Sequence, residues 1–121
     1  MKYVLLSHDF EPSVYLVPDI VADNLAKYFC EFADKWLWES PHAEEYRQKF
    51  REIRRNNIDI NGDTAGVCYG EHDFIKYLNT WVFPDNPSVF IETLTGVRGD
   101  WDLSPGRPLP EKYKNCEWFN F

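Results

Sequence analysis

Cys68 and His72 come nearest in this chain to a catalytic spacing. They lie four residues apart, where a predicted strand ends and a predicted helix begins. A thiolate at a helix N-terminus has a lowered pKa, so a Cys–His nucleophile is one interpretation of the pair. A zinc site would need three or four convergent ligands. The other cysteines and histidines form no paired motif with them: Cys30, Cys116, His8 and His42. We therefore interpret Cys68 as a buried structural cysteine and predict no metal site.

A second polar cluster alternates as the first ligands of a calcium loop do: Asp59, Asn61 and Asp63. Position six of such a loop would be Thr64 instead of glycine, and position twelve would be Gly70 instead of glutamate. The cluster therefore predicts a hairpin turn around Asn-Gly, the strongest short hairpin signal, and no calcium site.

A third cluster, Glu71, His72 and Asp73, has the side chains of a general acid–base site. Adjacent residues on a helix point in different directions, so one substrate would hardly meet all three. Negative charge in the first turn of a helix is itself favourable and explains both carboxylates. The sequence has no phosphate-binding glycine loop and no hydrolase motif. We predict a protein that is not an enzyme and uses no cofactor. The alternative is a small enzyme or ligand-binding domain that uses Cys68 and His72.

An α+β fold would position these residues, with two consecutive long helices and one shorter helix packed on a small, mainly antiparallel sheet. The predicted order is β-β-α-α-β-β-α-β. The predicted strands are residues 2–6, 13–17, 57–60, 64–69 and 88–94. A chain of 121 residues favours a single domain, 1–121, on which we expect the turn-rich, aromatic segment 95–121 to dock.

The first long helix is predicted between Pro18 and Ser40, with Asp19 as its N-cap. At 100° per residue its apolar side chains fall within an arc of roughly 100°, which predicts a core face. These side chains are Val21, Leu25, Tyr28, Phe29, Phe32 and Trp36. The opposite face carries charges of alternating sign four residues apart and is predicted to be solvated.

The second long helix is predicted over residues 41–57, with Ser40 as its N-cap. Arg47, Arg51 and Arg54 would fall within roughly 60° of one another on this helix. A solvated face is the simpler interpretation of the row. Because like charges four residues apart are mildly destabilising, the row is also a candidate contact surface for phosphate, nucleic acid or an acidic partner.

Five tryptophans are exceptional for this length. Trp36 and Trp81 fall on apolar helix faces and are predicted to be core residues. Trp38, Trp101 and Trp118 do not, and an exposed tryptophan beside charge is typical of a protein interface. We therefore predict a partner-binding surface that consists of these three tryptophans, which we call the uncommitted tryptophans, and the arginine row. Its residues are Trp38, Arg47, Arg51, Arg54, Trp101 and Trp118.

The net charge of −7 opposes binding to a phosphate backbone and favours a basic partner. Three widely spaced cysteines indicate no disulfide framework, and no apolar run is long enough for a membrane span. Neither a signal peptide nor a membrane contact is expected. We expect a cytoplasmic protein.

Together these features favour a non-enzymatic, acidic protein-binding module. The leading hypothesis is an inhibitor of a basic, nucleic-acid-handling protein such as a nuclease, of the bacterial or phage kind found in toxin immunity and phage counter-defence. A homo-oligomeric structural or assembly protein, joined through its C-terminal aromatic residues, is a further alternative, and the sequence leaves a homodimer open.

Overall fold

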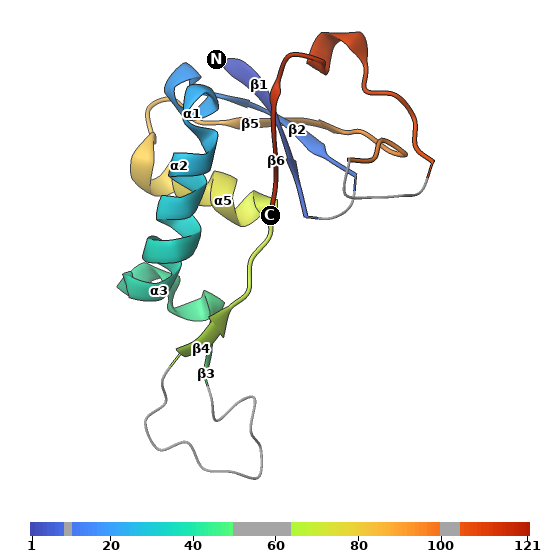
Figure 1. The fold of residues 1–121 in the computed structure, drawn as a ribbon. Coiled ribbons are helices and arrows are strands. Elements are labelled where there is room, and N and C mark those ends of the chain that lie inside the picture. Colours follow the sequence, from blue (N-terminus) through green and yellow to red (C-terminus); the bar gives the residue numbers. More distant parts are fainter. Residues whose placement is uncertain (9–10, 50–63, 100–104) are drawn as a thin grey trace.

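The computed structural model describes residues 1–8, 11–49, 64–99 and 105–121. The fold is α+β, as predicted: a four-stranded sheet carries helices on one face (Figure 1). A long helical segment runs from the sheet to a two-stranded hairpin at the opposite end of the molecule. The turn at 61–62 and the predicted strand at 57–60 lie outside the described residues.

The sheet has the strand order β5-β2-β1-β6. It consists of β1 (Lys2–Ser7), β2 (Ser13–Val17), β5 (Val89–Thr93) and β6 (Glu117–Asn120). The two pairings of β2, with β1 and with β5, are antiparallel, whereas β6 lies parallel to β1, so the sheet is mixed. The strands predicted at 2–6, 13–17 and 88–94 are thereby confirmed. The strand β6 was not predicted, although we expected its segment to dock.

Both faces of the central strands are buried. Val4 and Leu6 of β1 face the helices, whereas Leu5 packs in a second cluster on the other face. All three side chains are inaccessible to solvent. Because side chains alternate along a strand, this burial explains why 4–6 is a continuous apolar run without polar residues.

The first predicted helix forms as four consecutive pieces: α1 (Asp19–Asp23), α2 (Leu25–Cys30), the π-helical η1 (Glu31–Trp36) and α3 (Leu37–Glu39). Asn24 interrupts it with φ −135° and ψ 37°, and its side-chain amide donates to the carbonyl of Ile20 at 2.9 Å. Asp19 does not cap the helix, contrary to expectation. The N-terminal ammonium binds its carboxylate at 2.7 Å instead.

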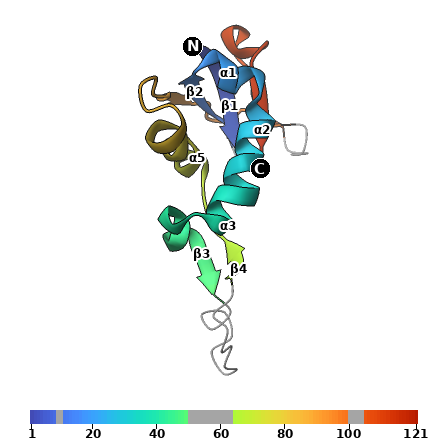
Figure 2. The ribbon, with the colours of Figure 1, turned by 90° about the vertical axis from the view of Figure 1, so that its left-hand side faces the viewer.

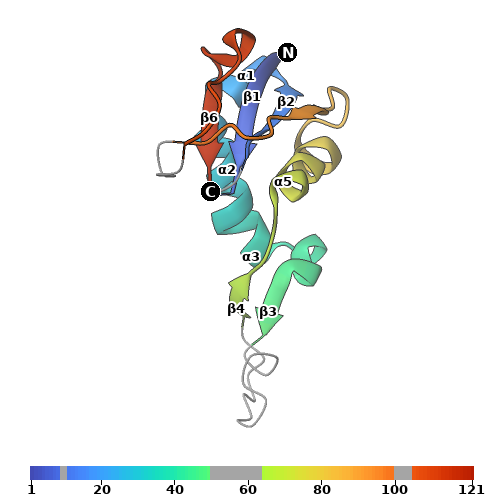
Figure 3. The same ribbon diagram turned by 90° about the vertical axis from the view of Figure 1, so that its right-hand side faces the viewer.

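The second predicted helix ends after six residues. Ser40 caps a 3-10 helix, η2 (Pro41–Tyr46), as expected, but the chain then enters β3 (Arg47–Lys49). This strand pairs antiparallel with β4 (Thr64–Val67). The prediction of a helix through residue 57 is therefore wrong for 47–49. The resulting hairpin projects beyond the end of α3, away from the large sheet (Figures 2 and 3).

The third helix is confirmed as α5 (Glu71–Tyr77), which continues into the π-helical η3 (Leu78–Val82). At its start the Asp73 carboxylate accepts from the backbone N–H of Gly70 at 2.8 Å. At its end the N–H of Phe83 donates to the carbonyl of Leu78 at 2.7 Å, a bond across five residues that defines the π turn. The helix lies beside the long segment in both side views (Figures 2 and 3).

An aromatic cluster joins these elements. The Phe29 ring lies 4.7 Å from Phe119 of β6 and 5.4 Å from Phe74 of α5, measured between ring centroids. It also lies 4.5 Å from the C-terminal Phe121 and 5.9 Å from Tyr69. Phe29 therefore joins the long helix to α5, to β6 and to the chain terminus.

The C-terminal segment covers the other face of the sheet. Tyr113, in the 3-10 helix η4 (Glu111–Tyr113), is fully buried there, and its hydroxyl donates to Glu92 at 2.6 Å. Gly96 turns the chain with φ 82°, a conformation that favours glycine, and its carbonyl accepts from the N–H of Arg107 at 2.8 Å.

Replacing Phe29 with alanine tests the cluster. We expect the free energy of unfolding to fall by about 3–5 kcal/mol, because a buried ring is lost and a cavity remains between four elements. Urea denaturation followed by circular dichroism measures this fall. Ile20→Ala is the control, since Ile20 is 52% exposed. Equal losses in both variants would contradict the central place of Phe29.

Stability at high pH tests the burial of Tyr15, which is 5% exposed. Burial, with a smaller contribution from Glu71, raises the pKa of Tyr15 to about 12, above the ordinary value of 10. The unfolded chain therefore loses this proton first, and stability present below pH 10 declines as the pH rises towards 12. We expect Tyr15→Phe to make the decline shallower in urea titrations across this range. An unchanged slope would show that Tyr15 is not its source.

Candidate protein-binding groove

Two adjoining hollows lie between the long helical segment and α5–η3, and we call them together the aromatic groove. The first, of about 440 Å³, is lined by Glu31, Lys35, Trp36, Glu39, Ser40 and Tyr77. The second, of about 190 Å³, shares Trp36 and Tyr77 with the first. It extends over His42, Glu45, Tyr46, Asp73 and Trp81, among others. Their shared aromatic pair makes the two hollows one continuous surface.

The floor of the groove is fixed by the core beneath it. The half-buried rings of Trp36 and Tyr77 lie 5.1 Å apart between centroids. Phe32, which is fully buried, contacts both from below, at 5.9 Å and 5.2 Å. Because Phe32 belongs to the main cluster, the two rings are held in place without any ligand.

Both helical segments that border the groove contain a π turn, while α3 contributes Glu39 and α5 contributes Tyr77 to the lining. The π turn η1 supplies Glu31, Lys35 and Trp36, and η3 supplies Trp81. Short π-helical insertions in α-helices are frequent at functional sites, since they redirect side chains at a cost in hydrogen-bond geometry. Their coincidence on facing helices marks this surface out from the rest of the molecule.

Trp81 is exposed, which corrects its assignment to the core. The side chain is 49% accessible, and its ring stacks on His42 of η2 at 4.3 Å between centroids and 26° between planes. The assignment assumed α-helical periodicity through residue 82. A π turn advances through a smaller angle per residue, so Trp81 falls away from the apolar stripe that contains Leu78.

Carboxylates without ion pairs border the groove. Residues 19–46 contain seven acidic residues and only two lysines. Asp19, Asp23 and Glu44 are neutralised by the N-terminal ammonium, Lys2 and Arg47 respectively. Within the described part of the chain, no ion pair forms with the other three carboxylates that concern the groove: Glu31, Glu39 and Glu45. The lining of the groove is therefore net negative, with Glu31, Glu39, Glu45 and Asp73 against Lys35 and Lys76.

The tyrosine hydroxyls of the groove remain protonated at neutral pH. Desolvation, with smaller effects of Asp73 and Glu45, raises the pKa of Tyr46 to about 12, and its hydroxyl donates to Asp73 at 3.3 Å. The pKa of Tyr77 is raised by desolvation and then by the charge of Glu31. Both groups therefore add hydrogen-bonding capacity without adding charge.

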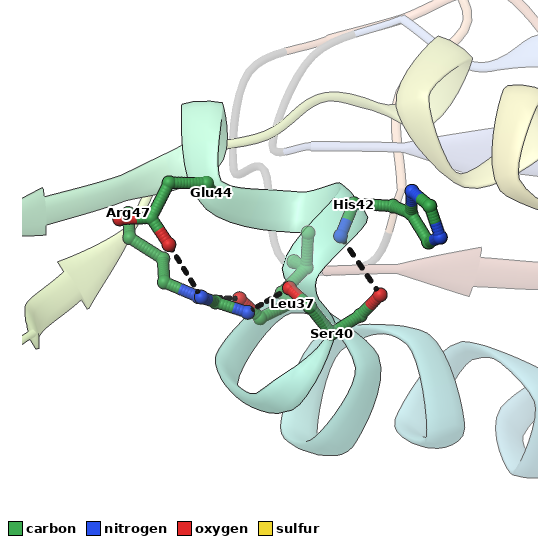
Figure 4. Close-up of polar contacts among 5 residues, drawn as sticks. All are labelled: Leu37, Ser40, His42, Glu44 and Arg47. Carbon is green, nitrogen blue, oxygen red and sulfur yellow. Dashed lines mark hydrogen bonds and ion pairs between the residues drawn. The ribbon is translucent and has the colours of Figure 1, made fainter.

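Arg47 fixes the end of the groove instead of forming part of an arginine row. Its guanidinium donates to the carbonyls of Leu37, at 2.7 Å, and Ser40, and to the Glu44 carboxylate at 2.9 Å (Figure 4). The side chain is only 8% exposed. Since 47–49 is a strand, the helical row with Arg51 and Arg54 does not form at this end. Those two residues lie outside the described part of the chain.

Cys68 lies in the connection between β4 and α5, and His72 lies in the first turn of α5. Cys68 is exposed, so the expectation of a buried cysteine is wrong, and its backbone N–H donates to the Tyr46 carbonyl at 2.9 Å. His72 is exposed, with Nε2 3.5 Å from the Asp73 carboxylate. Across the ranges that the structure describes, no three potential metal-ligating side chains gather. The Glu71 carboxylate accepts from Ser13 at 3.3 Å, so this neighbour has a structural contact.

The three uncommitted tryptophans have different positions. Trp38 is 41% exposed on α3. Trp118 is half-buried in the second cluster, and its indole N–H donates to Ser7 at 2.9 Å, which gives it a structural role. Trp101 lies outside the described residues. The sequence analysis did not identify Tyr77 and His42 as residues of a binding surface. The one sequence signal of the groove was the four-residue spacing of Glu31, Lys35 and Glu39.

A second exposed apolar patch lies on the edge strand β5. Val89, Phe90 and Ile91 are 50%, 54% and 38% accessible. The adjacent Glu92 accepts from Tyr113 at 2.6 Å and pairs with Lys112 at 3.4 Å. This patch therefore offers apolar area without the net negative charge found at the aromatic groove.

The comparisons with known proteins add no relative. No family model matches the chain, and neither the curated proteins nor the solved structures include a significant match. Among the described residues, none of the helices combines the length and apolar character that a membrane crossing requires. The functional argument accordingly rests on the groove itself.

Replacing Arg47 tests its structural role. We expect Arg47→Ala to lower the free energy of unfolding by about 1–3 kcal/mol, because the Leu37 carbonyl loses its donor and the Ser40 carbonyl keeps the backbone N–H of Ala43 but loses the guanidinium. Arg47→Lys should recover part of this loss, since an ammonium cannot reproduce the planar fork of donors. Lys76→Ala, at an exposed position, is the control in the same urea titrations. A neutral Arg47→Ala variant would assign Arg47 to the surface instead.

Proposed function

We propose that this protein is a non-enzymatic binding module that attaches to a basic surface of another protein through the aromatic groove. The observation that carries the proposal is the combination of a rigid aromatic floor with a border of unpaired carboxylates. Aromatic residues are enriched at protein interfaces, and complementary charge directs the encounter.

The exposed tryptophans favour a protein over a small ligand. Trp81 and Trp38 present large apolar areas to solvent, at 49% and 41% accessibility. Tryptophan is among the residues that contribute most binding energy when a partner covers it. Its stacking on His42 holds Trp81 in one orientation, which lowers the entropy lost on association.

The partner class is a nuclease or another nucleic-acid-handling protein. Such proteins cluster lysine and arginine over the surface that meets phosphate. An acidic groove is complementary to that surface, whereas nucleic acid itself would be repelled. Occupying the basic surface would block its normal ligand, so the binding module acts as an inhibitor.

Affinity capture with the intact protein tests the proposal. Partners recovered from lysate by the wild type are identified by mass spectrometry and then purified. We expect a basic partner whose dissociation constant rises at least about thirtyfold for Trp81→Ala, as at an interface hot spot. Ile20→Ala is the matched control, because it removes a similarly exposed apolar side chain outside the groove.

Salt dependence provides the second measurement. Raising the ionic strength from about 0.01 M to about 0.15 M shortens the screening length from roughly 30 Å to 8 Å. We expect slower association and weaker binding over this range. The proposal is wrong if the partner is acidic. It is also wrong if neither added salt nor Trp81→Ala changes the dissociation constant.

A further inference from the structure

We infer that the first hollow of the groove receives an arginine side chain, whose guanidinium stacks on the Trp36–Tyr77 floor between the Glu31 and Glu39 carboxylates. This inference rests on the proposed function and specifies its anchor. It names the group on the basic partner that the hollow recognises. The hollow is expected to bind the guanidinium of an arginine more tightly than the ammonium of a lysine.

The lining of the hollow supplies both components of guanidinium recognition. Trp36 and Tyr77 form an aromatic floor with ring centroids 5.1 Å apart. Glu31 and Glu39 are two helical turns apart on one side of the long helical segment, and both line the hollow. A volume of about 440 Å³ lies within the usual range for ligand pockets.

The chemistry of the floor favours arginine over lysine. A guanidinium is planar, so it can stack on an aromatic face while its edge donates to carboxylates. An ammonium is compact and strongly hydrated, and it cannot do both with one group. Glu31 and Tyr77 line the same hollow, so a guanidinium on the aromatic floor has a carboxylate beside it.

Lys35 is the one cation that lines the hollow, midway between the two glutamates in sequence. Within the described residues it forms no ion pair with either. Its exposed side chain can turn into solvent when a guanidinium enters. Glu31, Glu39 and Lys35 together give the hollow a net charge of −1, and a bound guanidinium brings this sum to zero.

Titration of the intact protein with N-acetyl-L-arginine amide tests the inference. Binding is followed by nuclear magnetic resonance through the indole N–H signals. We expect the Trp36 signal to shift and the Trp118 signal to stay in place, because Trp118 donates to Ser7 in the other cluster. The neutral isostere N-acetyl-L-citrulline amide should leave both signals unmoved, and the lysine amide should bind more weakly.

Charge-neutralising variants locate the bound group. In E31Q/E39Q we expect the dissociation constant of the arginine amide to rise about tenfold, as loss of a charge-assisted hydrogen bond predicts. Asp34→Asn is the control, since Asp34 is an exposed carboxylate of η1 that does not line the hollow. Unfolding midpoints of both variants show whether the fold is intact.

The outcomes separate this inference from the proposed function. No Trp36 shift with the arginine amide, or an equal response to the citrulline or lysine amide, overturns the arginine site. If a basic partner nevertheless binds and depends on Trp81, the proposed function stands alone. If the arginine amide binds as expected but no partner depends on the groove, the guanidinium site stands and the proposed function fails.

Discussion

The packing of Phe29 and Phe32 is the constraint on which the rest of the structure depends. Phe29 contacts rings from α5, β6 and the C-terminus, and Phe32 supports Trp36 and Tyr77. Two adjacent turns of one helix therefore close the core on one side and build the groove floor on the other. A groove supported in this way is as rigid as the core, so association orders few additional side chains.

The hydrophobic periodicity of the sequence was enough to predict the first helix and most of the large sheet. Residues 19–39 carry a full apolar face, and 4–6 is buried on both sides, so local pattern and tertiary burial agree. The C-terminal strand β6 escaped prediction because its partner, β1, is more than a hundred residues away and pairs with it in parallel. No local turn signal marks such a pairing.

The prediction of the second long helix was wrong because of the hydrogen bonds that Arg47 makes. Its spacing to Arg51 and Arg54 matched a helix face, but its guanidinium donates to the Leu37 and Ser40 carbonyls at the end of the first helix and to the Glu44 carboxylate of η2. Satisfying two helix-terminal carbonyls is worth more than continuing a helix whose like charges repel. The repulsion was visible in the sequence, whereas the acceptors were not, because they come from the preceding turn of chain.

The groove was only partly predictable because some of its features are visible in the local sequence, whereas others depend on contacts with another segment. Glu31, Lys35 and Glu39 are visible as a four-residue spacing in one helical segment, but Tyr77 comes from α5 and Trp81 from the π turn η3 that follows it. Periodicity assigns Trp81 to the core because it assumes α-helical geometry throughout. A π turn has less favourable backbone hydrogen-bond geometry than an α-helix, and it moves side chains from the core face to the surface. Finding two of them opposite each other, beneath unpaired carboxylates, is why the groove and not the β5 edge is the surface to test first.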